Sequence, residues 1–369
     1  MRLLTMAIVA MATIWSCQPK TQEEAPQSSS QILFENLQAI AGKATLFGHQ
    51  DDLAYGIGWK YVEGESDVKR LAGDYPALFG WELGGLELGH SQNLDSVPFQ
   101  TMKELAVWAH NNGGVNTFSW HPFSAVDSTK SSWDTDEVVV QHILPGGSHH
   151  AEFLVHMEKV ADFFKALKTE EGETVPFIFR PWHEMDGSWF WWGASLTSPE
   201  ELKALFRFSI EYLHENGVTN FLTAYSPDRH FTNLEEYLTW YPGDDIIEVI
   251  GMDNYHDLRQ GEEGLKAAIE KLEIVAKYAH QTGKVAAFTE TGLDGIGDET
   301  WYTETLGAAI NATEWTRKIT YAMVWRNRDL GHYYVPHANQ PAAEDFKTFV
   351  NQENIWLMKD WSEFSQQKK

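Results

Sequence analysis

The sequence predicts a single-domain (β/α)8 barrel, the TIM-barrel class of α/β fold. Strand-length apolar runs alternate with segments of helical periodicity, and no composition break or Gly/Ser-rich linker interrupts residues 31–369. Parallel strands that alternate with helices in this way close into a barrel when there are eight of them. The eight runs lie at residues 45–50, 77–83, 114–122, 176–184, 220–228, 246–255, 284–292 and 319–327.

The helical segments between these runs have recognisable ends. Segment 198–217 begins with Ser198, Pro199 and Glu201, which supply a helix cap, a first-turn proline and a capping-box glutamate. Segment 262–283 ends at a glycine, a common stop residue. Both segments therefore fit the connections that a barrel of parallel strands requires.

An open, doubly wound sheet is the structural alternative. That fold normally carries a G-x-G-x-x-G turn after its first strand, and the stretch GHQDDLAYGIG at residues 48–58 lacks this spacing. A long stretch at residues 122–152 follows the third run. We expect it to form an elaborated loop on the face where barrels bind ligands.

The first 30 residues indicate export. Residues 1–16 have a basic residue, an apolar run and a small residue before Cys17, which resembles a bacterial lipoprotein signal with lipid carried on Cys17. The alternative is an ordinary secretory signal. Residues 17–30 are polar and predict a flexible tether, so the folded domain is expected at 31–369. We expect a membrane-anchored protein of the periplasm or cell surface of a Gram-negative bacterium, or else a secreted one.

The charge and the aromatic content of the chain limit the kinds of molecule that it can bind. The chain has 369 residues, with 28 Lys and Arg against 53 Asp and Glu, and a net charge of −25 that repels nucleic acid and anionic membrane surfaces. Membrane contact is expected through the lipid anchor alone. The 16 tryptophans are typical of proteins that stack sugars, and the single cysteine excludes an internal disulfide.

Two glutamates stand at the ends of apolar strands. In such a barrel, functional groups come from the carboxyl ends of the strands, and Glu184 and Glu290 each follow a buried run. A pair of carboxyl groups suits glycosidic cleavage, provided that one is kept protonated and the other ionised. Arg180 and the hydroxyl of Tyr255 are the candidates for holding Glu290 ionised.

Four motifs in order along the chain resemble glycoside hydrolase family 26, whose best-known members are β-mannanases. They are RPWHEMDGSWFWWG at 180–193, GMDNYHD at 251–257, FTETG at 288–292 and VWRN at 324–327. The resemblance covers roughly residues 31–360, essentially the whole mature domain.

The resemblance implies a role for each matching position. Glu184 becomes the general acid/base and Glu290 the nucleophile, with Tyr255 as the hydrogen-bond donor to the nucleophile. The remaining matches are substrate-binding positions near the −2, −1 and +1 sugar sites: His121, His183, Trp189, Trp325 and Arg326. About half of the tryptophans in 189–192 are expected to touch ligand, because alternate residues of an extended segment point in opposite directions. Trp133, His149 and His150 in the long loop are left unassigned.

The expected function is retaining cleavage of β-1,4-mannosidic linkages in mannan, galactomannan or glucomannan by a monomer that needs no cofactor or metal. Retention implies a carboxyl separation of about 5 to 5.5 Å. A β-glucanase or xylanase of the same fold and a non-catalytic glycan-binding lipoprotein are the alternatives. A metal-dependent hydrolase is disfavoured because such sites commonly start from paired histidines on one strand, and the first strand ends in a lone His49.

Overall fold

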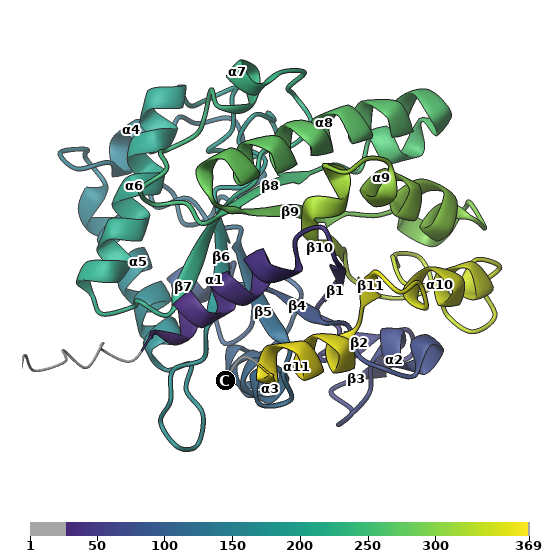
Figure 1. The fold of residues 1–369 in the computed structure, drawn as a ribbon. Helices are drawn as coiled ribbons and strands as arrows, with labels where there is room; N and C mark the ends of the chain where they lie inside the picture. Colours follow the sequence, from purple (N-terminus) through teal and green to yellow (C-terminus); the bar gives the residue numbers. More distant parts are fainter. Residues whose placement is uncertain (1–26, 368–369) are drawn as a thin grey trace, which may run out of the picture.

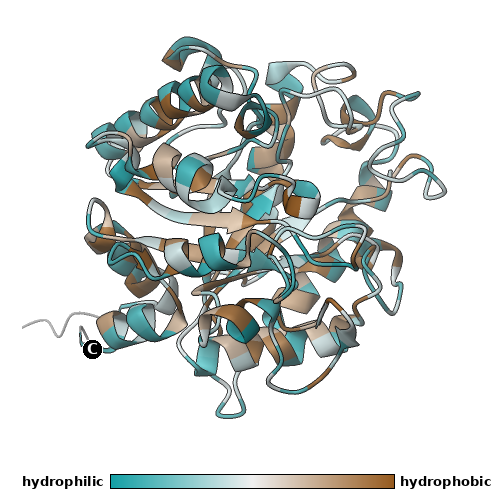
Figure 2. Cartoon of the chain, turned by 90° about the vertical axis from the view of Figure 1, so that its right-hand side faces the viewer, coloured by the Kyte–Doolittle hydropathy of each residue, from teal (hydrophilic) through white to brown (hydrophobic). Residues whose placement is uncertain are grey.

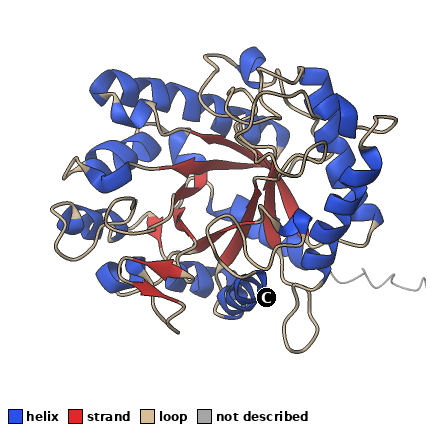
Figure 3. Cartoon of the chain, turned by 180° about the vertical axis from the view of Figure 1, so that it is seen from behind, coloured by secondary structure: helices blue, strands red, loops and turns tan. Residues whose placement is uncertain are grey.

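A computed structural model describes residues 27–367 and contains the expected barrel. Adjacent barrel strands are parallel in every pair, and the last barrel strand pairs with the first through Leu46 and Tyr321, which closes the barrel (Figures 1 and 3). The barrel strands are β1 (Thr45–Gln50), β4 (Leu78–Glu82), β5 (Val115–Trp120), β6 (Phe177–Pro181), β7 (Phe221–Tyr225), β8 (Val249–Asp253), β9 (Val285–Thr291) and β10 (Ile319–Val324).

Helices surround the strands, as Figure 3 shows from behind. The α-helices are α1 (Ser29–Ile40), α2 (Asp67–Ala72), α3 (Phe99–Asn111), α4 (Val140–Ile143), α5 (His150–Lys165), α6 (Pro199–Glu215), α7 (Leu234–Tyr237), α8 (Gly261–Thr282), α9 (Ala308–Asn311), α10 (Ala343–Val350) and α11 (Met358–Gln366). Shorter helical pieces are η1 (Leu86–Leu88), η2 (Asp257–Arg259), η3 (Asp294–Ile296), the π-helix η4 (Trp301–Gly307) and η5 (Thr316–Lys318). Small strands are β2 (Tyr55–Gly56), β3 (Trp59–Lys60) and β11 (Ile355–Trp356).

The expected helix ends are present. Ser198 caps α6, its side chain accepts from the backbone of Glu201, and Glu201 bonds back, so the capping box forms with Pro199 in the first turn. Helix α8 ends at Gly283 in the left-handed region, at φ 66°. The expected loop at 122–152 contains α4 and ends in the first turn of α5.

More than ninety buried apolar side chains of the described residues form an outer and an inner core. The outer core lies between barrel and helices, and the helices carry both hydrophobic and hydrophilic residues (Figure 2). The inner core fills the amino-terminal half of the barrel, where α1 lies across the strand ends and buries Leu33, Leu37 and Ile40 (Figure 1). Higher in the barrel, Gly80 lacks a side chain because a Cβ there would lie 2.0 Å from Oε1 of Gln50. The carboxyl-terminal half contains buried polar side chains, among them Gln50, Arg180 and Glu290.

The amino-terminal expectations fall mostly outside the described residues. The signal at 1–16 and the lipid-bearing Cys17 are among them, as is most of the tether. At the tether's end the structure differs from the prediction, because Ser28 caps a helix that begins at Ser29 and the folded part therefore starts before residue 31. Within residues 27–367, none of the helices is long and apolar enough to cross a membrane.

Candidate active site

Glu290 lies on β9 and is held by two donors. The guanidinium of Arg180, on β6, bonds Oε2 of Glu290, and the hydroxyl of Tyr255, just beyond β8, donates to Oε1 at 2.7 Å. Arg180 also bonds Oδ2 of Asp253 at 2.6 Å and is itself fully buried. The two contacts fix the orientation of the Glu290 carboxyl group and stabilise negative charge on it. The two candidates expected to hold Glu290 both contact it.

Glu184 lies on a turn rather than at the end of a strand. Strand β6 ends at Pro181, three residues earlier than expected, because Trp182 and Glu184 have φ of 54° and 53°. Such angles are uncommon for residues other than glycine and often mark functional sites. The turn is anchored by the Glu184 amide, which donates to the carbonyl of Ser226 at 2.8 Å. It aims the Glu184 carboxyl over the mouth of the barrel.

The surroundings of Glu184 favour its protonated form. Burial raises the pKa of Glu184 well above its usual value, and the negative charges of Glu290, Asp253 and Asp228 raise it further. A hydrogen bond from Nε1 of Trp189 to Oε2 of Glu184, at 2.6 Å, opposes this shift in part. The site therefore holds one carboxyl group by cationic and hydroxyl donors and places the other among carboxylates.

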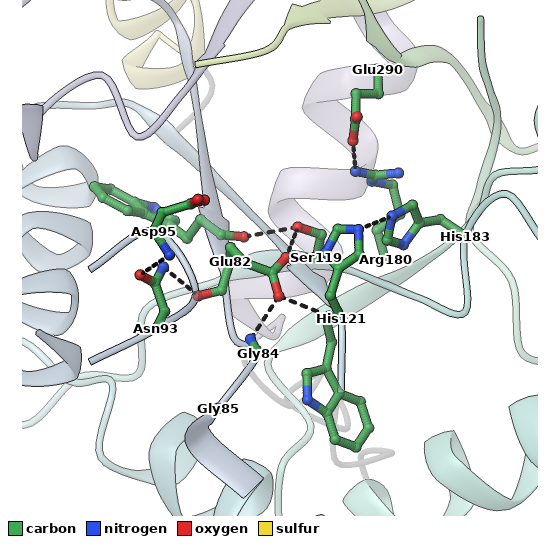
Figure 4. A network of polar contacts seen from close by, with 12 residues as sticks. Glu82, Gly84, Gly85, Asn93, Asp95, Ser119, His121, Arg180, His183 and Glu290 are labelled. Atoms are coloured by element: carbon green, nitrogen blue, oxygen red, sulfur yellow. Dashed lines mark hydrogen bonds and ion pairs between the residues drawn. The ribbon is translucent and has the colours of Figure 1, made fainter. Parts of the chain in front are cut away.

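His121 and His183 form a buried chain with Glu82 (Figure 4). The Glu82 carboxylate accepts from Nδ1 of His121 at 2.7 Å and from the hydroxyl of Ser119 at 2.6 Å. Since that carboxylate accepts only, Nδ1 of His121 carries a proton. Nε2 of His121 and Nε2 of His183 lie 3.0 Å apart. Burial, Arg180 and His121 together lower the pKa of His183 well below its usual value, so His183 is neutral.

Most of the tryptophans in the motif after β6 are structural. Trp182, Trp191 and Trp192 are fully buried, and the indole N–H groups of the last two donate to the carbonyls of Pro122 and His183. Trp189 is half-buried and contacts Glu184. Of the three tryptophans in 189–192, Trp189 is thus the one that is open to the mouth of the barrel, whereas about half were expected to be available to ligand.

The unassigned residues of the long loop separate into two groups. Trp133 is 53% exposed and stacks on His121, with ring centroids 5.1 Å apart and planes 8° from parallel. The Ser132 carbonyl next to it accepts from the amide of Trp191, which fixes the loop against the motif after β6. His149 and His150 begin α5, where the His150 ring contacts the carbonyl of Ile143. Trp133 therefore belongs to the site, whereas these histidines hold a helix end.

A cleft of about 770 Å³ adjoins the site on the side of β1, β4 and β10. Arg326, which follows the half-buried Trp325, lines it and bonds Oδ1 of Asp95 at 2.8 Å and the hydroxyl of Tyr55 at 3.3 Å. Tyr55 also donates to Asp51 at 2.6 Å, and burial with the charge of Asp95 raises the pKa of Asp51 to about 8.

Sequence reasoning missed part of this cleft. Asp51 and Asp95 received no role, although Asp51 directly follows the first predicted strand in HQDD, and that position was the available indication. Asp95 lies in the irregular segment after β4, where no strand end marks it. Among residues 27–367, no group of three or more His, Cys, Asp or Glu side chains is arranged to hold a metal ion.

A closed eight-stranded barrel whose carboxyl-terminal mouth holds one glutamate bonded by Arg180 and Tyr255, and a second glutamate whose pKa is raised by burial and nearby carboxylates, defines a glycoside hydrolase of the two-carboxylate type. The sequence profile described as Glycosyl hydrolase family 26 matches residues 22–303. The chain belongs to glycosyl hydrolase family 26.

Solved structures and curated relatives agree with this assignment. A family 26 β-mannanase from Bacteroides ovatus superposes with a TM-score of 0.86 at 40% identity, covering 91% of this chain and 96% of that one. An endo-β-1,4-mannanase from Cellulomonas fimi gives 0.83 at 34% identity, covering 90% and 76%. A mannan endo-1,4-beta-mannosidase from Bifidobacterium adolescentis is 30% identical over 92% of this chain, which spans 35% of that relative's length.

Proposed function

We propose that this chain is a retaining β-1,4-mannanase acting on mannan, galactomannan or glucomannan. The observation that carries the proposal is the contrast between Glu290, bonded by Arg180 and Tyr255, and Glu184, whose pKa burial and nearby carboxylates raise. Double displacement needs this pairing of an ionised nucleophile with a protonated acid. The names of the relatives, mannanases and mannan endo-1,4-beta-mannosidases, support the choice of substrate.

In the first step, a carboxylate oxygen of Glu290 attacks the anomeric carbon while Glu184 gives its proton to the departing glycosidic oxygen. The carbon–oxygen bond to the leaving sugar breaks, and a glycosyl ester to Glu290 forms. Trp189 occupies Oε2 of Glu184 as a donor, which leaves Oε1 to carry the proton. Tyr255 and Arg180 keep the attacking group oriented.

In the second step, Glu184 is a carboxylate and takes a proton from water, whose oxygen attacks the same carbon and releases Glu290. Two inversions give net retention of the β configuration. Trp325 is the platform for the −1 sugar, and His121 and His183 contact sugar near the cleavage point. Trp189 borders the +1 site, and Arg326 serves the −2 site through the cleft that it lines.

The deciding experiment is a product time course on β-1,4-mannan with the purified full chain, Glu184→Ala and Glu290→Ala. Each variant is expected to lose about three or more orders of magnitude in turnover while remaining folded. Glu170→Ala, at an exposed position, is the control and should keep full activity. Proton NMR of the first-formed product should show the β anomer; the α anomer would exclude retention.

Other outcomes distinguish the alternatives. Activity on a β-glucan or xylan through the same two glutamates would keep the mechanism and replace the substrate. Binding of mannan without turnover in the wild-type chain would favour a glycan-binding lipoprotein. Full activity after treatment with a chelator is expected, because the proposed steps use side chains alone.

We also propose that the protein is exported, is lipidated on Cys17 and acts as a monomer, with membrane contact through the lipid. The sequence pattern of residues 1–17 supports the anchor. Incorporation of labelled fatty acid into the full chain, compared with Cys17→Ser, tests lipidation, and light scattering of the purified protein tests the monomer. Label in the serine variant equal to wild type would contradict lipidation at Cys17.

A further inference from the structure

Two loops meet beside Glu184 and are joined at regular intervals. The Glu184 amide donates to the carbonyl of Ser226. Two residues further along each of the two loops, the amide of Asp228 donates to Oδ1 of Asp186 at 2.6 Å. The amide of His230 donates to Oδ2 of Asp186 at 2.9 Å. Asp186 therefore fixes the segment after β7 against the turn that carries Glu184.

This connection places the Asp228 side chain in a fixed and poorly compensated position. Asp228 is 6% exposed. The cations nearest to it are Nδ1 of His230 at 3.4 Å and Nε of Arg229 at 3.7 Å, both on side chains about a third exposed to solvent. These separations are those of ion pairs weakened by water rather than of short hydrogen bonds. Its negative charge is therefore only partly neutralised, and it is one of the charges that act on Glu184.

The carboxylates that act on Glu184 come from β8, β9 and the segment after β7. Glu290 on β9 and Asp253 on β8 are paired with the buried cation of Arg180. Asp228 differs from them because its partners are partly exposed. Tyr255 and Trp189 contribute a neutral hydroxyl and a neutral indole. Of the carboxylates near Glu184, Asp228 is thus the one whose charge is least cancelled by a buried cation.

We propose that Asp228 is a positioning residue whose charge keeps the proton on Glu184 until the leaving sugar takes it. The inference rests on the proposed function of Glu184 as the acid. Burial, followed by the charge of Asp186, raises the pKa of Asp228 to about 6, against the backbone of Arg229 and the charge of His230. Asp228 therefore becomes charged over the pH range in which an ordinary glutamic acid has already lost its proton. The charge of Asp228 thus favours the protonated form of Glu184 in the pH range where Glu184 has to keep its proton.

The test is the pH profile of kcat/KM for Asp228→Asn. With mannotetraose, whose leaving sugar needs a proton, the alkaline limb is expected to move to lower pH by about 0.5 to 1 unit, a loss of about 3- to 10-fold on that limb. With 2,4-dinitrophenyl β-mannobioside, whose leaving group needs none, kcat/KM should match wild type. His230→Gln removes a positive charge from the same cluster and should move the limb to higher pH.

Controls separate the possible failures. Asp162→Asn on α5 removes an equal charge from the outer surface and should leave both profiles unchanged. Glu184→Ala should lose activity on mannotetraose and keep kcat/KM on the aryl substrate, because that ratio reports the first step, in which this leaving group needs no proton; if it does not, the proposed function fails. If Glu184→Ala behaves as expected and Asp228→Asn leaves the limb in place, or loses equally on both substrates at every pH, the role of Asp228 is overturned. Should Asp228→Asn misfold, an unmoved limb in His230→Gln overturns it.

Discussion

Glu184 and Glu290 have the same side chain, and neighbouring residues give them opposite chemistry. Tyr255 donates to Oε1 of Glu290, whereas Glu184 receives one indole N–H and faces three carboxyl groups. The sequence allowed both glutamates and both donors of Glu290 to be predicted, because all four lie toward the carboxyl ends of predicted strands. Asp51 and Asp95 were not predicted: the position of Asp51 after the first strand was an indication, but Asp95 contacts Arg326, which lies more than two hundred residues away along the chain.

Tyr255→Phe removes the hydroxyl donor and keeps the ring. Hydrogen bonds to charged groups contribute about 1.5–3 kcal/mol, so kcat/KM on mannan should fall about 10- to 100-fold. Tyr278→Phe on α8 is a matched control, because that hydroxyl donates at 3.0 Å to Asp244 on the surface. Steady-state kinetics at the pH optimum measure both. Equal activity of Tyr255→Phe and wild type would show that Arg180 alone orients the nucleophile.

Glu184→Gln should stabilise the fold in a pH-dependent way. The unfolded chain loses the Glu184 proton near pH 4.3, whereas burial and nearby carboxylates raise its pKa in the folded state. Wild type therefore loses stability as pH rises through that interval, and the neutral amide avoids the loss. We expect a gain of about 1 kcal/mol at pH 8 and none at pH 4. Urea unfolding at both values checks this, with Glu170→Gln as control; a gain equal at the two pH values would contradict it.

At the scale of elements, prediction succeeded for strands and failed where the backbone leaves regular geometry. Strand β1 has the predicted bounds, Thr45–Gln50, because its apolar run and the turn after it mark both ends. Strand β6 ends early because Trp182 and Glu184 adopt positive φ. Tryptophan and glutamate rarely adopt this conformation, so no residue pattern announces it. The turn is imposed by the bond from Glu184 to Ser226 and by packing of the buried tryptophans.

Helix α6 should depend on its predicted cap. Ser198→Ala removes the side chain that accepts from the amide of Glu201, which should lower the free energy of unfolding by about 1 kcal/mol. Because the cap lies beyond the motif that carries Glu184, kcat on mannan should stay unchanged at 25 °C. Chemical denaturation and kinetics measure the two effects. Ser198→Gly is the control and should cost only a few tenths of a kcal/mol; equal costs for both variants would show that the hydroxyl contributes little.

At the scale of the whole molecule, stability and chemistry lie at opposite ends of the barrel. The carboxyl-terminal mouth holds Arg180, Glu184 and Glu290, while α1 covers the amino-terminal end with apolar side chains. Barrels of this class generally divide their roles in this way. The sequence allowed the barrel and its polar mouth to be predicted from strand-end patterns. It did not reveal that α1 closes the other end, because the contacts of a helix with strands far away along the chain depend on the tertiary fold.

Leu37→Ala tests this division of roles. Leu37 on α1 is fully buried in the inner core with Leu46 and Tyr321, so truncation should create a cavity and cost about 2–5 kcal/mol of unfolding free energy. Leu234→Ala, at a position 38% exposed on α7, is the same substitution at the surface and should change stability by less than about 0.5 kcal/mol.

Activity provides the second half of this test. The Leu37→Ala enzyme should keep wild-type kcat on mannan at 25 °C, since no reacting group lies at its end of the barrel, and should inactivate at a lower temperature. Trp189→Ala should lower kcat on mannan and leave the inactivation temperature nearly unchanged, because Trp189 is half-buried at the mouth and bonds Glu184. A large loss of kcat in folded Leu37→Ala at 25 °C would show that α1 is coupled to the active site through the barrel interior.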